Sequence, residues 1–403
     1  MLNLACSIKS QNCEENEGSL RVLHVLEDFS VGNTGVTAVV RQISQWQARQ
    51  CAWVGVYATG QSNLMAPEGV HVHYSELNSL SGGWRYPRGG EHELMQLVRN
   101  YGVTVIHLHG LWRAAPIIGM RVALCAGLPT VLSVHGQTSP WALEGQGGLK
   151  SLKKKLYWNG FAKARIGGAN VLHAITPLER QHMELFFGRR VATVIPNAID
   201  LDLPECEEYR PNSSPERVIG FLGRLHPVKG VDTLIRAFSE ASLAGRWRLL
   251  LAGPEEVPAY ADYLRGLAAS SSRSAQIEFC GPLYGQQKTD FLQRIWVLAA
   301  PSHTEVIGMV NLEAANLCTP SITTHETGLV NWEAGGGMLV SPEVVTLQAA
   351  LEKASCWSEA ERLLRGQASH DLVKDHYSLD VVGRTWLRLY RKLHTGCDEY
   401  SGS

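Results

Sequence analysis

Two short runs in the second half of the chain combine charged side chains with glycine. The first is Gly223-Arg-Leu-His-Pro-Val-Lys-Gly230, which holds the cations Arg224 and Lys229. It follows an apolar run, 218–222, and precedes a stretch with helical spacing, 231–239. Cations beside a helix start, where backbone N–H groups are free, suit a phosphate or diphosphate. A surface loop with two solvated cations fits the same residues.

The second run is Glu305-Val-Ile-Gly-Met-Val-Asn-Leu-Glu313, which has a carboxylate at each end. It follows an apolar run, 295–300, and Gly308 lies just before a helix-compatible stretch. The pattern predicts a loop carrying Glu305, then a helix whose first amides point at an anion, with Glu313 further along. Carboxylates suit the vicinal hydroxyls of sugars because each oxygen accepts charge-assisted hydrogen bonds. The alternative to sugar binding is that one glutamate complements the dipole of the helix and the other is a solvated residue on the helix surface.

Both motifs follow short runs rich in Val, Ile and Leu, and such runs alternate with helical stretches along the chain. The runs are 21–26, 53–58, 103–109, 130–135 and 170–175 in the first half, and 218–222, 247–252, 276–281, 295–300, 320–324 and 338–340 in the second. Continuous apolar strands alternating with helices predict α/β domains with parallel sheets covered on both faces. Ligands of such sheets bind outside the carboxyl ends of the strands, where both charged motifs fall.

A polar segment at 200–215, rich in acids and prolines, separates the two series of strands. This composition is typical of a linker and predicts two doubly wound domains. We expect a disordered leader at 1–18, a first domain at 19–198, a second at 199–375 and a closing helix at 376–395. Two such domains leave a cleft between them, and we expect the chemistry there.

Composition narrows the function classes further. The 403 residues are 45% hydrophobic and 19% charged, and the formal net charge of -1 gives no electrostatic bias toward nucleic acid. The N-terminus has no long apolar segment, and no stretch is long and apolar enough to span a membrane, so we expect a cytoplasmic protein. His107 and His109 lie two apart without a neighbouring acid or cysteine, so we predict no metal site.

Taken together, the motifs resemble glycosyltransferase family 4, whose members have the GT-B fold of two Rossmann-like domains with a C-terminal helix crossing back to the first. The pattern G-R-L-x-x-x-K-G and the two glutamates followed by Ala314-Ala-Asn-Leu-Cys-Thr-Pro320 carry the resemblance. Further similar segments are 32–36, 194–200, 250–253 and 279–282, with Ala198 where glycine is usual and a single Gly35 where the family often has two. Residues 133–143 resemble a subgroup that makes bacterial surface polysaccharides.

The resemblance implies transfer of a sugar from a nucleotide-sugar donor to a hydroxyl, with retention of configuration and without metal or cofactor. Arg224 and Lys229 would neutralise the departing diphosphate, Glu305 would hold the donor sugar, and Glu313 the ribose. His135, at a strand end of the first domain, would face the donor sugar. The other donor-binding residues implied are Gly35, Gly223, Gly253, Pro282, Leu283, Gly308, Met309 and Val310.

Acceptor contacts are expected from the first domain. His109 lies at a strand end, and Trp112 and Trp141 could stack on sugar rings, although ordinary packing suits them equally. The basic stretch Lys150–Arg165 also contains leucines and aromatic residues, which suits an anionic membrane surface and a lipid-linked glycan acceptor, as in lipopolysaccharide synthesis. A solvated basic face on a packed helix is the alternative.

Two other functions remain as alternatives. A nucleotide-sugar epimerase with the same fold is disfavoured by the match to the transferase motif from Glu305 to Glu313. A non-catalytic nucleotide-sugar-binding protein is disfavoured because His135, Arg224 and Lys229 occur together with both glutamates. The sequence leaves the donor sugar, the nucleotide base and the acceptor open.

Overall fold

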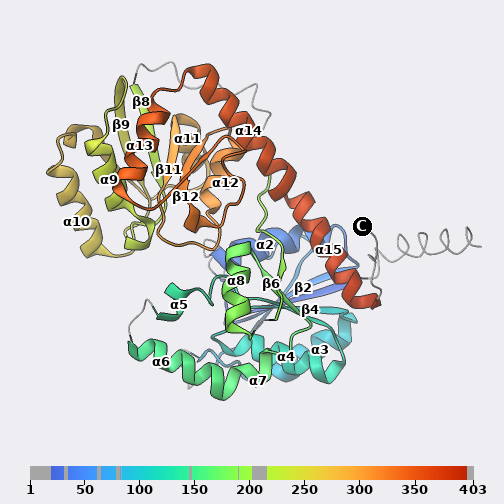
Figure 1. The fold of residues 1–403 in the computed structure, drawn as a ribbon. Coiled ribbons are helices and arrows are strands. Elements are labelled where there is room, and N and C mark those ends of the chain that lie inside the picture. The colour runs from blue at the N-terminus through green and yellow to red at the C-terminus, as the bar shows by residue number, and fades with distance from the viewer. Residues whose placement is uncertain are drawn as a thin grey trace, which may run out of the picture. The chain divides into compact units, whose positions relative to one another are not determined.

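The protein is described from a computed structural model, which covers residues 20–30, 35–60, 65–78, 82, 84–144, 148–188, 190–201 and 216–396. The predicted leader and most of the predicted linker lie outside these residues. The described chain divides into two units (Figure 1). Unit 1 holds the described residues up to Ala198 and from Leu379 onward, and unit 2 holds those within Ile199–Ser378.

Unit 1 is built on a parallel sheet with the strand order β3-β2-β1-β4-β5-β6-β7. The order changes direction between β1 and β4, so the loops after these two strands flank the point where open α/β sheets bind ligands. The strands are β1 (Arg21–Leu26), β2 (Trp53–Thr59), β3 (His71–Ser75), β4 (Val105–His109), β5 (Thr130–Ser133), β6 (Val171–Ala174) and β7 (Thr193–Val194).

Helices cover both faces of this sheet, because strand residues alternate between two apolar clusters. Leu23 and Ile106 face one cluster, which includes α3 and α4, while Val22 and Val105 face the other, which includes α2 and α15. The helices are α2 (Gly35–Ala48), α3 (Gly90–Tyr101), α4 (Ala114–Ala126), α5 (Pro140–Glu144), α6 (Gly148–Tyr157), the π-helix η3 (Trp158–Ala162), α7 (Lys163–Ile166), α8 (Pro177–Phe186) and α15 (Leu379–Thr395).

The last helix, α15, completes the core of unit 1. Its apolar residues recur with helical spacing, and Val382, Trp386 and Tyr390 are buried against β1, β4 and α2. The indole N–H of Trp46 on α2 donates to the carboxylate of Asp380, at 2.8 Å. The predicted closing helix therefore exists, but it begins at Leu379, after α14 (Glu359–Tyr377) has ended.

Unit 2 repeats the architecture with a parallel sheet in the order β10-β9-β8-β11-β12-β13. The direction changes between β8 and β11. The strands are β8 (Glu216–Leu222), β9 (Arg246–Ala252), β10 (Ile277–Gly281), β11 (Val297–Ala300), β12 (Ser321–Thr324) and β13 (Met338–Val340). The helices are α9 (Val231–Glu240), α10 (Pro258–Ala269), α11 (Gly285–Arg294), α12 (Met309–Asn316), α13 (Val344–Ser355) and α14, with 3-10 turns η5 (Pro227–Lys229), η6 (Ser274–Gln276) and η7 (His325–Thr327).

The predicted fold class is confirmed, since both units are parallel sheets with alternating helices. Among the described residues, no helix combines the length and the apolar character needed to cross a bilayer.

Candidate functional site

In unit 2, the ends of β8, β9 and β10 approach so closely that one position requires glycine. The Gly223 N–H donates to the Ala252 carbonyl at 2.9 Å, and the Gly253 N–H donates to the Gly281 carbonyl at 2.8 Å. Gly253 has a φ of 149°, and a Cβ there would overlap the carbonyl oxygen of Gly223. The predicted donor-binding glycines 223 and 253 thus form one compact backbone edge.

The loops that flank the change of strand direction in unit 2 are joined to each other. They are the loops after β8 and β11, and they carry the two charged sequence motifs. The His303 N–H donates to the Val228 carbonyl at 2.8 Å. Gly230 adopts a φ of 65°, and a Cβ there would overlap the carbonyl of Pro301. Close backbone contact therefore brings the two motifs together at the expected ligand edge.

Lys229 and Glu305 meet at this edge as an ion pair. Their side chains are 18% and 15% exposed, so the pair is only partly hydrated. Glu305 also accepts a hydrogen bond from the Ser302 hydroxyl at 2.8 Å, and its N–H donates to the Glu326 carbonyl at 3.0 Å. An incoming anion would find a cation already oriented, with Glu305 as the group it must displace.

The other two predicted charged residues pair with partners that the sequence did not point to. Arg224 contacts Glu256 at 2.5 Å, and Lys288 on α11 contacts Glu313 at 2.6 Å. Arg224 is about half exposed, which leaves its guanidinium accessible. Glu256 follows β9 in a run of two glutamates, so its place after a strand end was the available signal.

The start of α12 differs from the expected open anion site. The Gly308 N–H donates to the Thr327 carbonyl at 3.1 Å, and the Met309 N–H donates to the Ile307 carbonyl at 2.9 Å. The two backbone donors predicted there are thus used within the protein, and Val310 occupies the first turn of the helix. Of the remaining predicted residues, Pro282 and Leu283 follow β10, and Gly35 opens α2 in unit 1.

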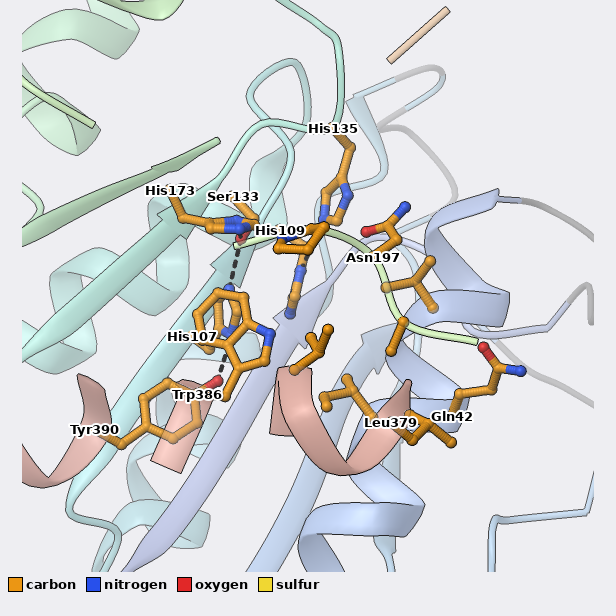
Figure 2. Close-up of a pocket in the computed structure, with 15 residues that line it drawn as sticks. Gln42, His107, His109, Ser133, His135, His173, Asn197, Leu379, Trp386 and Tyr390 are labelled. Atoms are coloured by element: carbon orange, nitrogen blue, oxygen red, sulfur yellow. Dashed lines mark hydrogen bonds between the residues drawn. The ribbon is translucent and has the colours of Figure 1, made fainter. Parts of the chain in front are cut away.

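Unit 1 contains a cluster of histidines on neighbouring strands (Figure 2). They are His24 on β1, His107 and His109 on β4, His135 just after β5, and His173 on β6. His135 is partly exposed, and the other four are buried. A pocket borders four of them, all but His24, together with residues of α2 and α15 and the segment 196–198. Their hydrogen bonds form two rows.

The first row runs across the sheet to α15 and has a fixed direction. His173 donates from Nε2 to the Ile195 carbonyl at 2.8 Å, because a carbonyl can only accept. Ser133 therefore donates to His173 Nδ1 at 2.6 Å and accepts from His107 Nε2 at 2.6 Å. The Tyr390 hydroxyl completes the row by donating to His107 Nδ1 at 2.7 Å (Figure 2).

The second row joins α2 to His135. Gln47 Oε1 lies 2.8 Å from His24 Nε2, and His24 Nδ1 lies 3.0 Å from His109 Nε2. His109 Nδ1 in turn lies 2.9 Å from His135 Nε2. No motif in the sequence pointed to His24 or Gln47; a histidine within the apolar run 21–26 was the available signal.

His24, His107 and His109 also form the kind of group that can hold a metal ion. Their ligand atoms all lie within 4.8 Å of one another. Each ring nitrogen of the three residues already has a hydrogen-bond partner. A metal would have to replace these bonds.

The histidine cluster is uncharged at neutral pH. Burial lowers the pKa of His24 and of His173 to about 4, and the pKa of His135 to about 3. Burial, and after it the neighbouring rings, also hold the pKa values of His107 and His109 well below the ordinary 6.5. A charged imidazole would lose its hydration there, so the neutral form is favoured.

Glu179 on α8 holds the backbone beside His135. Its Oε1 accepts from the Gly136 N–H, and its Oε2 accepts from the Ile175 N–H at 2.6 Å. Burial raises the pKa of Glu179 to about 7, although these backbone bonds oppose the shift. His135 itself has a φ of 51°, which is uncommon for a residue other than glycine. A buried carboxylate thus supports a strained turn at a predicted catalytic residue.

The three predicted acceptor residues differ in exposure. His109 is only 4% exposed and both its ring nitrogens are paired, so a direct contact with an acceptor would have to replace one of these hydrogen bonds, and its acceptor role stays a prediction. Trp112 is partly buried against Tyr157 and Phe186, as the packing alternative implied. Trp141 on α5 is exposed.

Known proteins share this architecture. HepE of Anabaena, solved in complex with UDP, is similar with a TM-score of 0.72 and 15% identity over 93% of this chain and 100% of that one. A glycosyltransferase of Rickettsia africae is similar with a TM-score of 0.73 and 16% identity over 94% and 99%. WaaG, a glycosyltransferase involved in lipopolysaccharide biosynthesis, is similar with a TM-score of 0.67 and 16% identity over 92% of this chain and 99% of that one. The predicted GT-B fold is thereby confirmed.

Curated relatives match over shorter regions. D-inositol 3-phosphate glycosyltransferase of Kineococcus radiotolerans is 29% identical over 180 residues, which is 41% of this chain and 41% of the relative. The enzyme of the same name from Rhodococcus opacus is 31% identical over 152 residues, which is 33% of this chain and 34% of the relative. The matches thus span less than half the length of these relatives.

Two family models match consecutive parts of the chain. "Glycosyltransferase Family 4" matches residues 33–203, which fall in unit 1 and at its boundary with unit 2. "Glycosyl transferases group 1" matches residues 207–354, which fall in unit 2. With both models matched and the GT-B fold present, the chain belongs to the family 4 type of glycosyltransferases.

Proposed function

We propose that the protein transfers a sugar from a nucleotide-sugar donor to a hydroxyl group, with retention of configuration and without a metal ion. The observation that carries the proposal is the Lys229–Glu305 pair, held where the unit 2 sheet changes strand direction. The complexes of HepE with UDP and with UDP-glucose support a nucleotide-sugar donor.

Breaking the glycosidic phosphate bond builds positive charge on the sugar and negative charge on the leaving diphosphate. Lys229 and the accessible Arg224 supply cations for that developing negative charge, and such preorganised charge is a main source of catalysis. When the diphosphate takes Lys229, the Glu305 carboxylate is freed to accept hydrogen bonds from the sugar. Glu313, held by Lys288, accepts from the ribose, and Val310 at the start of α12 lies along the donor.

His135 and Trp141 of unit 1 complete the assignment. His135 contacts the sugar being transferred, as the family resemblance implies, and Trp141 offers an exposed ring to the acceptor. The acceptor hydroxyl attacks the face from which the diphosphate leaves, and its proton passes to the departing diphosphate oxygen on that same face. Bond formation and bond breaking on one face retain the configuration.

The acceptor is a lipid-linked glycan of surface polysaccharide synthesis, and the surface of α6, η3 and α7 favours it over a free inositol phosphate. Leu152, Leu156 and Phe161 are 53%, 65% and 36% exposed. The π-turn at η3 contains an extra residue, so Phe161 stays on the side of Leu156 instead of rotating away. Trp158, Ala162 and Ile166 anchor the opposite side in the core.

Cations flank this apolar stripe. Lys153, Lys155, Lys163 and Arg165 are exposed, and Arg165 lies over the Phe161 ring at 3.8 Å. Each basic residue near an anionic bilayer contributes about 1 kcal/mol of attraction. We infer that this surface rests on an anionic membrane and that the protein works at the cytoplasmic face.

The donor is tested by thermal unfolding with UDP-, GDP- and ADP-sugars. A ligand at 100 times its dissociation constant stabilises the folded state by about 2.7 kcal/mol. Product NMR with the stabilising donor then gives the anomeric configuration. Binding without transfer or hydrolysis would favour the non-catalytic alternative, and an epimerised free donor would favour the epimerase. Stabilisation by none of the donors would contradict the proposal.

The membrane contact is tested with a variant carrying Lys153→Glu, Lys155→Glu and Lys163→Glu. We expect it to leave vesicles of phosphatidylglycerol to which the wild type binds. A variant with Arg246→Glu, Lys353→Glu and Lys374→Glu makes the same charge change on exposed residues of unit 2 and should still bind. Equal vesicle binding by both variants would reject the assigned surface.

A further inference from the structure

We propose that His24 and His109 are positioning residues that fix the tautomer of His135, so that its Nδ1 faces outward as a hydrogen-bond acceptor. The inference deepens the proposed function and rests on it for the role of His135 in transfer. The hydrogen bonds of the row all lie within unit 1, so the row does not depend on the proposed function.

The direction of the row follows from the residue at its inner end. Gln47 Oε1 can only accept, so His24 carries its proton on Nε2 and donates it to Gln47. His24 Nδ1 is then the acceptor, and His109 must donate to it from Nε2.

The direction of the second row continues from His109 to the surface. His109 has its proton on Nε2, so its Nδ1 accepts from His135 Nε2. The only ring nitrogen of His135 left without a proton is Nδ1. The inner histidines are buried, while His135 is partly exposed, so the row ends at the surface of unit 1.

Burial keeps each member of the row in the neutral form that this direction requires. The pKa values of all three histidines lie well below neutrality, since a charge there would lose its hydration. A neutral imidazole with so low a pKa is a weak base. His135 Nδ1 therefore accepts a hydrogen bond from a substrate hydroxyl and orients it, without taking up the proton.

A metal site in the same cluster is the competing assignment. It would use His24, His107 and His109, whose ligand atoms are close enough. Every one of those nitrogens is satisfied by a protein partner, and the bonds form two continuous rows. A preformed metal site would instead leave lone pairs converging on one point, so the geometry favours the hydrogen-bonded row.

The structure provides a matched control two residues away. His107 lies on the same strand and the same side as His109 and is equally buried. Its nitrogens bond Tyr390 and Ser133, so it belongs to the first row and does not touch His135. The His107 ring also stacks on His109, with ring centroids 4.1 Å apart. Leucine keeps an apolar side chain at this position and removes no hydrogen bond of the second row, so we expect that row to stay in place.

Nitrogen-15 NMR of the histidine rings reads the tautomer directly, without any substrate. In the wild type at pH 7 we expect the His135 ring to be protonated on Nε2 and unprotonated on Nδ1. His109→Leu and Gln47→Leu should give a mixture of tautomers at His135. His109→Asn should restore the wild-type tautomer, because its side-chain oxygen can replace Nδ1 as the acceptor, and His107→Leu should not change it.

Turnover of UDP-glucose, or of the donor that stabilises the protein most, gives the second readout. We expect His109→Leu and Gln47→Leu to lower kcat by roughly 10- to 100-fold, which is the scale known for losing the partner that orients a metal-bound histidine, with KM little changed. His109→Asn should recover most of the loss. A large loss in His107→Leu as well would show that packing, and not the row, is responsible.

The outcomes separate the inference from the proposed function. An unchanged His135 tautomer in both His109→Leu and Gln47→Leu overturns the positioning role whether or not the protein is a transferase. The expected tautomers with no turnover of any donor uphold the row and contradict the transferase. Stoichiometric binding of Zn²⁺ by the wild type, lost in His24→Leu, would show a metal site and overturn the inference.

Discussion

The carboxyl edges of the two sheets hold opposite kinds of polar chemistry. In unit 2 the edge carries ion pairs, Lys229 with Glu305 and Arg224 with Glu256, and these side chains are partly hydrated. In unit 1 the edge carries neutral histidines joined in rows, and all of them except the partly exposed His135 are buried.

Hydration explains the difference. An ionised group loses several kcal/mol when it leaves water without full compensation, so charges persist only where some solvent or a partner remains. Buried imidazoles avoid that cost by staying neutral and sharing single protons. The comparison fits the proposed function, in which unit 2 receives the donor diphosphate and unit 1 orients uncharged groups such as hydroxyls.

The largest expected effect is acid unfolding that begins in unit 1. His24 and His173 have folded pKa values of about 4 against an ordinary 6.5, so below pH 6.5 the unfolded chain binds more protons. Stability from these groups is present above pH 6.5 and is lost as the pH falls toward 4. At about 1.4 kcal/mol per pH unit each, the two lose about 4 kcal/mol between pH 7 and pH 5.

Hydrogen exchange at pH 7 and pH 5 measures this effect unit by unit. Peptides from β1, β4, β5 and β6 should lose protection more than peptides from β8, β9 and β11. Equal loss in both units would remove the contrast between them.

The next effect concerns the cation of unit 2. Lys229→Ala should lower turnover of the donor by about 10² to 10³-fold, because a preorganised charge for the leaving diphosphate is removed. Its thermal unfolding should remain close to that of the wild type. Arg248→Ala, which breaks the exposed pair with Glu278 on neighbouring strands, is the control and should keep full turnover. Wild-type turnover in a folded Lys229→Ala protein would remove the role assigned to that residue.

A smaller effect is expected from the one buried carboxylate that supports His135. Glu179→Gln should lower the free energy of unfolding by about 1–3 kcal/mol at pH 5, because an amide nitrogen would face one of the two backbone N–H donors. The raised pKa means that wild-type stability from this group falls as the pH rises from 4.5 through 7. The difference between variant and wild type should therefore shrink by pH 8.

Urea unfolding at both pH values checks this prediction. Glu184→Gln on the same helix removes a partly exposed pair with Arg180 and should change stability by less than about 1 kcal/mol. A Glu179→Gln deficit that stays constant from pH 5 to pH 8 would show that the carboxyl titrates at its ordinary pKa.

The smallest expected effect is that of chelation. Turnover of the donor should be the same with and without EDTA, because the charge on the diphosphate is met by side chains. An activity that disappears with EDTA and returns with one divalent ion would contradict the metal-free mechanism and direct attention to the histidines of unit 1.

Much of the fold could be predicted from the alternation of apolar runs with helical stretches. The predicted helix at 231–239 is α9, and most predicted strands are present within a few residues. Strand β3 escaped notice because its sequence, His-Val-His-Tyr-Ser, is half polar at the edge of the sheet. Helix α4 has apolar residues all round, so it shows no helical period to distinguish it from a buried strand.

The site residues that belong to one local sequence motif could be predicted. Those that come together from strands far apart in the sequence could not. The charged motifs placed Lys229 and Glu305 near one ligand, but their direct pairing depends on the approach of Gly230 to Pro301. The spacing of His107 and His109 put both rings on one side of a strand. It could not show that β1 supplies His24 beside them, because the strand order and register that join these residues are not written in any one segment.

The return of α15 to unit 1 has a consequence for how the protein is made. Unit 2 is contiguous within Ile199–Ser378, whereas unit 1 lacks Trp386 and Tyr390 until the last part of the chain is synthesised. On the ribosome, the domain that starts first therefore finishes last. Until Tyr390 arrives, His107 has no hydroxyl to accept from, and a nascent chain would expose the apolar side of β1 and β4 to water and to chaperones.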